Sequence, residues 1–336
     1  MRLDEEDRGE ALTEPIGEAS AMMQRCGESP RHKVLVLFSG PYDRQDGIQE
    51  QLRRFGSEVV MIDNDEKNGG DATHDLLNEA FYAELLRRVK SGEFSAVIAA
   101  PPCSTFSIAR FFPVANNRDH GPPPVRTRDL PRGIVEQSAG YKLEAERANL
   151  LVTRTCTILG AAFNSGAEFI LENPADRGNP RDRYLFLHAD HAPIWVLSEV
   201  QLLQETTGAR QITFPMCEVG HQSQKLTTLL VTSNLASQLD FLSDLRCRHK
   251  SHDAVGGRRD KDGVKFTSAQ ASQYPAQLNF IFAQAIAEAT TPRSVDGVCP
   301  RSTEDPEWIS GWEVQRDREG RSYRTAIIDS DQLMGP

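Results

Sequence analysis

The sequence predicts an α/β protein in which a mostly parallel sheet carries helices on both faces. Short apolar runs alternate along the chain with segments whose apolar residues recur at helical spacing. This alternation is typical of βαβ units. The chain has 336 residues, of which 39% are hydrophobic and 26% charged, as in soluble globular proteins. No apolar run reaches the length of about 18 residues that a membrane-spanning helix needs.

The expected elements follow one another from residue 34 onward. Apolar runs predict strands at residues 34–38, 59–62, 94–99, 169–171, 194–197 and 228–232. Helical periodicity predicts helices at residues 44–55, 75–90, 139–164 and 275–289. Residues 110–133 are rich in Arg, Pro, Asn and Gly and have no periodicity, which indicates a long loop that is either functional or disordered.

Both ends of the chain differ in composition from this central part. Residues 1–30 are polar and poor in aromatic residues, so we expect a disordered leader before a domain that covers residues 31–290. Residues 291–336 are enriched in Pro, Asp, Arg and Gly and predict a flexible tail. Within the tail, residues 311–323 faintly resemble the first hairpin of a WW domain, but that module's second tryptophan and final proline are missing.

Charge and cysteine content limit the compartment and the partners. The net charge of −10 excludes a uniformly basic surface, although a local basic face can still bind nucleic acid. The six cysteines are scattered along the chain, which favours a reducing, intracellular setting over a disulfide scaffold. The N-terminus lacks the apolar region of a secretory signal. We expect an intracellular monomer with no membrane partner.

Cys103 directly follows one of the predicted strands, in the segment Ala-Pro-Pro-Cys-Ser-Thr-Phe-Ser at residues 100–107. The two prolines cannot continue a sheet ladder, so we expect the thiol to project into a loop above the strand. Open α/β sheets bind their ligands at this edge. A thiolate placed there is a nucleophile, whereas the alternative interpretation is a small buried hydrophobic residue.

Two other predicted strands end in residues that suit a nucleoside ligand. Phe38, Ser39 and Gly40 close the first strand, and a small residue followed by glycine lets a ligand approach the backbone. Asp63 ends the second strand and could accept hydrogen bonds from ribose hydroxyls, although a plain turn and a helix cap explain this pair equally well. Asp71 could bond an adenine amino group or cap the helix that follows.

The strand at residues 169–171 leads into Glu172, Asn173 and Pro174. A carboxyl group at the end of the strand beside Cys103 can act as an acid toward a ring nitrogen. The alternative interpretation of Glu172 is a helix-capping acid. Separate structural roles explain less well why Cys103 and Glu172 occur in this order, each at the end of an apolar strand.

In their order along the chain, these motifs resemble those of the cytosine-5 DNA methyltransferases. That family combines a Phe–small residue–Gly cofactor motif, an acid after the second strand, a Pro-Cys-x-x-Phe-Ser loop and a Glu-Asn motif, and residues 31–175 hold counterparts of all four. The chain is similar in particular to divergent methyltransferase-like proteins of algae, oomycetes and mobile elements. The resemblance implies a Rossmann-like fold that binds S-adenosyl-L-methionine, a small target-recognition insert at residues 233–270, and duplex DNA as partner. If the chain is eukaryotic, the resemblance implies the nucleus as its compartment.

The same resemblance implies a role for each matched residue. Cys103 would attack C6 of a cytosine flipped out of the duplex, Glu172 would hydrogen-bond or protonate N3, and C5 would take the methyl group. The implied cofactor-binding residues are Phe38, Ser39, Gly40, Asp63, Asp71 and Pro101, and the implied substrate-binding residues are Ser107, Asn173, Pro174, Gln222 and Lys225. The loop after Cys103 is either a solvated surface loop or one whose arginines contact phosphates, namely Arg110, Arg118, Arg126, Arg128 and Arg132.

The sequence departs from the family pattern at three places. Pro41 follows Gly40 where the family soon has a second glycine, and residues 222–226 lack both arginines of the family's Gln-x-Arg-x-Arg motif. Lys225 offers a point charge there, without the planar fork of arginine. Residues 269–275 correspond to the closing motif that completes the cofactor pocket, but without its usual pattern. Three alternatives therefore stay open: an inactive relative that binds DNA or the cofactor, an RNA cytosine methyltransferase, and an amino-methyltransferase.

Cysteine and histidine residues also gather in the later part of the chain. Cysteine and histidine are common zinc ligands in proteins. The candidates here are Cys217, His221, Cys247, His249 and His252. No Cys-x-x-Cys pair is present, so we assign no metal. The stretch at residues 246–261 is the most basic part of the chain. It predicts a DNA-facing loop that includes Arg246, Arg248, Lys250, Arg258, Arg259 and Lys261.

Overall fold

The computed structural model describes residues 32–111, 122–179, 187–253 and 273–290, and the backbone of four short strands beyond residue 253. The expected leader lies outside the described residues. The helices are α2 (Ile48–Arg54), α3 (Glu79–Lys90), α4 (Ala139–Asn164), α5 (Ser198–Thr207), α6 (Ser233–Leu239) and α7 (Ala276–Thr290). The strands are β1 (Lys33–Leu37), β2 (Glu58–Ile62), β3 (Ala96–Ala99), β4 (Glu168–Pro174), β5 (Arg210–Pro215), β6 (Leu226–Val231), β7 (Gly257–Asp260), β8 (Gly263–Phe266), β9 (Trp312–Arg316) and β10 (Ser322–Ala326).

Six of these strands form one sheet in the order β2-β1-β3-β4-β6-β5. The strands from β1 to β4 pair in parallel, whereas β6 runs antiparallel to both of its neighbours, β4 and β5. The sheet is therefore mixed, and the prediction of a mostly parallel sheet is wrong. The reason lies in the connection from β5 to β6, which holds only the short 3-10 helix η5 (Met216–Val219) and a turn. Parallel strands need a longer crossover, so β6 returns antiparallel.

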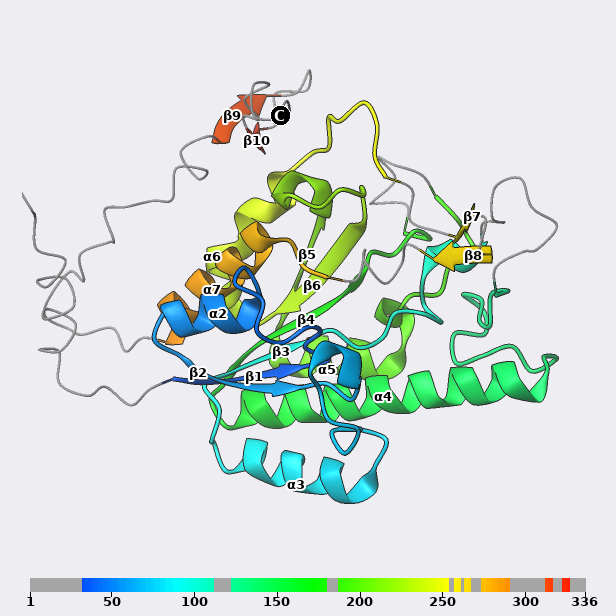
Figure 1. Ribbon diagram of the computed structural model, residues 1–336, viewed down its shortest axis with the longest axis horizontal. Helices are drawn as coiled ribbons and strands as arrows, with labels where there is room; N and C mark the ends of the chain where they lie inside the picture. The colour runs from blue at the N-terminus through cyan, green and yellow to red at the C-terminus, as the bar shows by residue number, and fades with distance from the viewer. Residues whose placement is uncertain are drawn as a thin grey trace, which may run out of the picture. The chain divides into compact units, whose positions relative to one another are not determined.

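Helices cover both faces of the sheet, as expected (Figure 1). Helices α2, α6 and α7 share one apolar core with the sheet, and α3, α4 and α5 share the other. Strand β1 contributes to both cores, because successive side chains of a strand point to opposite faces. Val34 and Val36 pack in the first core, and Leu35 and Leu37 pack in the second. The alternation of strands and helices therefore yields the covered sheet that the sequence predicts.

The predicted elements up to β4 are all present within a few residues. The helix predicted at residues 139–164 is α4, and the side chain of Ser138 caps its start by accepting from Tyr141 N. One prediction fails further along the chain, and two elements there were not predicted. Residues 194–197 were expected to form a strand, but they hold the 3-10 helix η4 (Ile194–Val196), and α5 and β5 were not predicted. A short apolar run does not distinguish a strand from a buried helical turn.

The segment after β6 begins inside the core. Helix α6 and the 3-10 helix η6 (Asp240–Asp244) bury Leu235, Leu239 and Leu242, so the first part of the expected insert packs against the sheet. Strands β7 and β8 pair antiparallel, as do β9 and β10 in the tail. Among the described residues, no helix is both long and apolar enough to cross a membrane.

Candidate active site

The carboxyl ends of β1 and β3 mark the point where the winding of the sheet reverses. The chain passes from β1 to β2 on one side, and then crosses to β3 on the other side of β1. Open α/β sheets bind ligands in the crevice at such a switch point. Ala100 N donates to Leu37 O at 3.4 Å, so the loops that follow β1 and β3 start side by side. The structure therefore brings two of the predicted motifs together at this edge.

Asp63 holds the loop after β1 in place. Its Oδ2 accepts from Gly40 N at 2.8 Å and from Asn68 Nδ2 at 3.5 Å, and its Oδ1 accepts from Asp65 N at 2.8 Å. Phe38 and Gly40 in this loop have φ values of 55° and 67°. Glycine adopts such values freely, but phenylalanine adopts them only under constraint. Because a carboxylate accepts about four hydrogen bonds, Asp63 retains room for about one ribose hydroxyl.

Asp71 lies beside the same loop. Its backbone N donates to Asp63 O at 3.0 Å, and its Oδ1 accepts from the N and Oγ1 atoms of Thr73, each at 2.8 Å. These bonds hold the pKa of the Asp71 carboxyl below its usual value. The cap of α3 is Asn78, so the alternative role of Asp71 as a helix cap is wrong. Gly70 passes so close to Asp63 that a Cβ would lie 2.3 Å from the Asp63 carbonyl oxygen, which requires glycine here.

Buried polar groups support the loop that carries Cys103. Phe106 N donates to Cys103 O at 2.9 Å and closes a tight turn. Arg126 is 1% exposed, donates to Thr105 O and Oγ1 at 3.1 and 2.9 Å, and stacks on the Phe106 ring at 3.8 Å. His191 Nδ1 accepts a backbone N–H at 3.0 Å, so its Nε2 holds the proton and donates to Phe106 O at 2.9 Å. These hydrogen bonds therefore fix the loop that carries the half-buried thiol of Cys103.

A buried carboxylate lies at the end of β4, the strand that pairs in parallel with β3. Glu172 is 4% exposed. Its Oε1 accepts from Thr227 Oγ1 and lies 3.6 Å from Lys225 Nζ. Its Oε2 accepts from Tyr274 OH at 3.1 Å. Three elements distant in sequence thus converge on this acid: β4, the start of β6 and the segment before α7.

The charges around Cys103 act on it in opposite directions. Burial raises the pKa of the thiol, the positive charge of Lys225 lowers it, and the negative charge of Glu172 raises it. Burial also raises the pKa of the Tyr274 phenol well above its usual value, and the charge of Glu172 adds to this effect. The phenol therefore stays protonated and remains a donor to Glu172. Thiol, carboxylate and ammonium group form one electrostatic unit.

Asn173 joins the ends of β3 and β4. It is 1% exposed, and its Nδ2 donates to Pro101 O at 2.9 Å. Its Oδ1 is buried and has no hydrogen-bond partner among the described residues. A buried acceptor without a hydrogen bond destabilises the protein. A ligand that donates an N–H or O–H to it would remove this penalty. Pro174 is positioned by its carbonyl, which accepts from Trp195 Nε1 at 2.7 Å.

Two predicted substrate-binding residues make other contacts. Ser107 Oγ accepts from Ala109 N at 3.2 Å, at the start of the 3-10 helix η2 (Ile108–Phe111). Gln222 is exposed, and its carbonyl accepts from Asp253 N at 3.2 Å. Within the described part of the chain, neither residue is hydrogen-bonded to Cys103 or Glu172.

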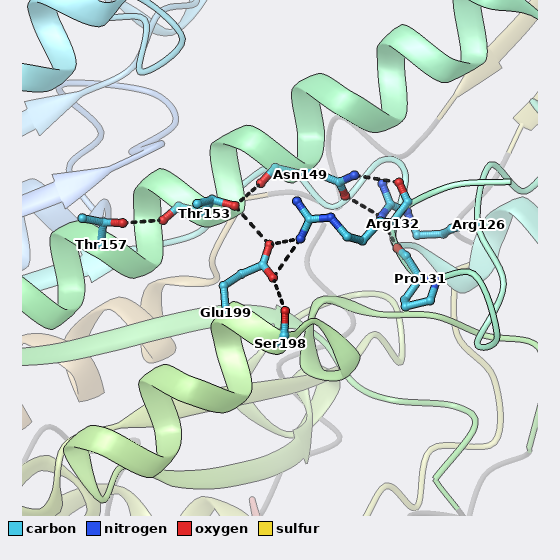
Figure 2. Close-up of polar contacts among 8 residues, drawn as sticks. All are labelled: Arg126, Pro131, Arg132, Asn149, Thr153, Thr157, Ser198 and Glu199. Carbon is cyan, nitrogen blue, oxygen red and sulfur yellow. Dashed lines mark hydrogen bonds and ion pairs between the residues drawn. The ribbon is translucent and has the colours of Figure 1, made fainter. Parts of the chain in front are cut away.

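The arginines of the loop after Cys103 bind groups of the protein itself. Arg126 is buried, so the expectation that it contacts phosphates is wrong. Arg132 donates to Glu199 at 2.9 and 3.0 Å, and Glu199 also accepts from Thr153 of α4 (Figure 2). Two further arginines also pair with carboxylates, Arg110 with Glu144 and Arg128 with Asp176. Arg118 lies outside the described residues. A phosphate would have to displace an acid at each of the three paired arginines.

Sequence reasoning missed Thr227 and Tyr274 as neighbours of Glu172. Thr227 had a local signal, because side chains two residues apart on a strand share a face and Lys225 had been selected. Tyr274 belongs to the segment compared with the family's closing motif, but no role was given to it. It lies 102 residues from Glu172 in sequence, so only the folded chain connects the two.

Cys103 is a free thiol, as are Cys156, Cys217 and Cys247 within the described ranges. The sulfur is therefore available for chemistry. No protein-family model matches the chain, and no curated protein matches it in sequence. A function has to be inferred from the site itself.

Proposed function

We propose that the chain transfers a methyl group from S-adenosyl-L-methionine to C5 of cytosine in DNA, with Cys103 as nucleophile and Glu172 as acid. The observation that supports this most is the pairing at one sheet edge of a half-buried thiol with a buried, hydrogen-bonded carboxylate. A nucleophile and a proton donor on neighbouring strands can act on two atoms of the same planar ring. The resemblance of the motifs to the cytosine-5 methyltransferases supports the same assignment.

Cys103 would act as the thiolate, which Lys225 favours. Its sulfur forms a bond to C6 of a cytosine that has left the base stack. The electron pair of the C5–C6 double bond then makes C5 nucleophilic. C5 would take the methyl group as its bond to the sulfonium sulfur of S-adenosyl-L-methionine breaks, which leaves S-adenosyl-L-homocysteine. A base would then remove the C5 proton, the electron pair of that C–H bond would restore the C5–C6 double bond, and the C6–S bond would break to release the thiolate.

Glu172 would hold a proton between its carboxyl group and N3 of the ring, which makes C6 more electrophilic. Tyr274 and Thr227 donate to this carboxyl group and fix its orientation. The orphan Oδ1 of Asn173 is an acceptor of the kind that the amino group of cytosine would satisfy. Lys225 takes the place of an arginine at the base, as a point charge without a planar fork.

The switch point of the sheet suits the cofactor, which would supply an electrophilic methyl group when bound. The loop at residues 38–40 lies at this switch point and contains a positive-φ glycine, and nothing lies within 4 Å of the position of a Gly40 Cβ. Asp63 retains acceptor capacity for about one ribose hydroxyl. Asp71 is exposed and free to face a base amino group with its second oxygen. Pro101 is buried, and its carbonyl accepts from Asn173 Nδ2.

A second candidate function is binding of DNA or the cofactor without chemistry. One observation favours it: burial raises the pKa of Cys103 and so disfavours the thiolate. The two candidates differ in whether a covalent bond to cytosine forms, and this can be measured directly.

The test measures transfer of tritiated methyl groups to mixed genomic DNA, followed by identification of the modified nucleoside. We expect 5-methylcytosine with the wild type and only background with Cys103→Ala. Cys156→Ala is the matched control, because burial in α4 raises the pKa of that thiol to about 12 and keeps it inert.

Three results would contradict the proposal. Methyl transfer by Cys103→Ala would show that Cys103 is not the nucleophile. Label found on adenine would indicate an amino-methyltransferase, and label found only with RNA would change the substrate. If the wild type binds the cofactor by calorimetry but forms neither product nor an adduct with a 5-fluorocytosine duplex, the non-catalytic candidate holds.

A further inference from the structure

A second cluster of reactive side chains lies between the helical turn after β5 and the segment after η6. It consists of Cys217, Cys247, His249 and His252, whose potential ligand atoms all lie within 4.8 Å of one another. Cys247 Sγ lies 3.6 Å from His249 Nδ1 and 3.1 Å from His252 Nε2. Cys217 is buried, and the other three are partly buried. The fold therefore brings together two thiols and two imidazoles that the sequence separates by 30 residues.

These distances fit a tetrahedral metal. Zinc is bound at about 2.3 Å by sulfur and about 2.0–2.1 Å by imidazole nitrogen, so the ligand atoms of a tetrahedral site are roughly 3.3 to 3.8 Å apart. Both contacts of Cys247 lie close to this range. Two cysteines and two histidines form one of the common structural zinc sets. Four protein ligands leave no open position for substrate, which distinguishes such a site from a catalytic one.

A carboxylate adds to the cluster from the side. Glu218 is 5% exposed, and its Oε1 lies 3.3 Å from His249 Nδ1. The same Nδ1 faces Cys247 Sγ, so Glu218 adds its negative charge to the cluster and is not an acceptor for the other ring N–H of His249. A cation in the cluster would also balance the charge of this buried acid.

We propose that Cys217, Cys247, His249 and His252 bind one zinc ion that fastens the basic stretch after η6 to the core. Asp253 N donates to Gln222 O at 3.2 Å, so this stretch is also hydrogen-bonded to the turn between β5 and β6. That turn ends at Lys225, which lies 3.6 Å from Glu172. The zinc ion thus stabilises the region that joins the most basic part of the chain to the candidate active site. His221 is not one of the side chains whose ligand atoms lie within 4.8 Å of one another, and its Nδ1 lies 3.0 Å from both N and O of Ser223.

The first test is the metal content of the full-length chain, purified without chelator or affinity-tag histidines. We expect about one zinc per chain by mass spectrometry of the metal. After exchange for Co²⁺, we expect the intense visible bands of tetrahedral cobalt and a sulfur-to-cobalt charge-transfer band. A chain that stays metal-free after incubation with zinc, or a cobalt spectrum without thiolate bands, would overturn the proposal.

Variants then identify the ligands. Cys247→Ser and His252→Asn should each lose zinc to a competing chelator at least about 10-fold more readily than the wild type. His221→Asn and Cys156→Ser are matched controls that should keep it. Equal retention by all four variants would show a metal bound elsewhere and would also overturn the proposal. Circular dichroism confirms that each variant is folded, and no measurement here depends on methyl transfer, so failure of the proposed function leaves this test unaffected.

Discussion

Two buried polar clusters adjoin the Cys103 loop, and they differ in how completely their hydrogen-bonding groups are satisfied within the described residues. In the first cluster, Arg126 donates to Thr105 O and Oγ1. It also donates to Pro131 O at 2.6 Å and to Asn149 Oδ1 at 2.9 Å (Figure 2). Its guanidinium group also stacks on a ring. At the sheet edge, Glu172 accepts from Thr227 and Tyr274 and lies 3.6 Å from Lys225, but the adjacent Asn173 keeps a buried acceptor without a partner among the described residues.

The difference separates a structural cluster from a binding one. Buried groups whose hydrogen bonds are all made within the chain stabilise the fold and have little capacity left for a ligand. Burial lowers the pKa of Arg126 to about 10, and the group remains charged at neutral pH because this pKa is still well above 7. A cluster with an unused acceptor has free energy to gain from a bound molecule. We therefore expect changes at Glu172 to affect chemistry and changes at Arg126 to affect folding.

The largest effect is expected for Glu172→Gln. Loss of a positioned general acid lowers rates by about 10²- to 10⁴-fold, while the amide keeps the shape and can still accept from Tyr274. Single-turnover methyl transfer measures the rate, and a gel shift measures DNA binding, which should change little. The matched control is Glu168→Gln at the other end of β4, where the carboxylate accepts from Asn234 Nδ2 at 2.7 Å. A Glu172→Gln rate equal to that of this control would show that Glu172 has a structural role and not a catalytic one.

The next effect is on stability and separates two arginines of one loop. Arg126→Ala leaves several buried acceptors without donors, so we expect the free energy of unfolding to fall by about 4 kcal/mol or more. Arg132→Ala removes an ion pair whose arginine is 58% exposed, and should cost at most about 1 kcal/mol. Urea unfolding measures both. Similar losses for the two variants would contradict the distinction between buried and exposed arginines.

The sequence predicts more of the fold than of the site, and the reason is the range over which each signal acts. Strand β1 and helix α4 follow from local periodicity, because an apolar run or a capped amphipathic segment has few alternative conformations. The reversal of β6 depends on the length of a connection whose strand β5 was not visible, since its Arg-Gln-Ile-Thr-Phe-Pro sequence is short and half polar.

The site shows the same limit. Cys103 and Glu172 could be selected because each follows its own apolar strand. Tyr274 could not, because its partner Glu172 lies 102 residues away. The residue types of the cluster around Cys217 could be selected, but the sequence did not show that Cys217 joins Cys247, His249 and His252. The basic composition of residues 110–133 suggested a phosphate-binding surface, but composition does not tell a buried arginine from an exposed one. Whether the arginines of this loop bind a ligand or pair within the protein depends on the acidic residues that the fold brings next to them.

The smallest of the three effects is a pH dependence that tests the structural cluster through His191. Burial lowers the pKa of this imidazole to about 4, below its ordinary value of 6.5, because its Nδ1 accepts from Arg177 N and cannot take a proton without losing that bond. Above pH 6.5 the ring is neutral in both the folded and the unfolded chain, and the full stability is present. Between pH 6.5 and 4 only the unfolded chain binds the proton, so stability falls as the pH falls, by about 3 kcal/mol in all. Urea unfolding of wild type and His191→Gln at several pH values isolates this contribution from that of the carboxylates. The wild type should lose about 1.4 kcal/mol per pH unit more than the variant in this window, and parallel curves would show that His191 is protonated as easily in the folded protein as in the unfolded chain.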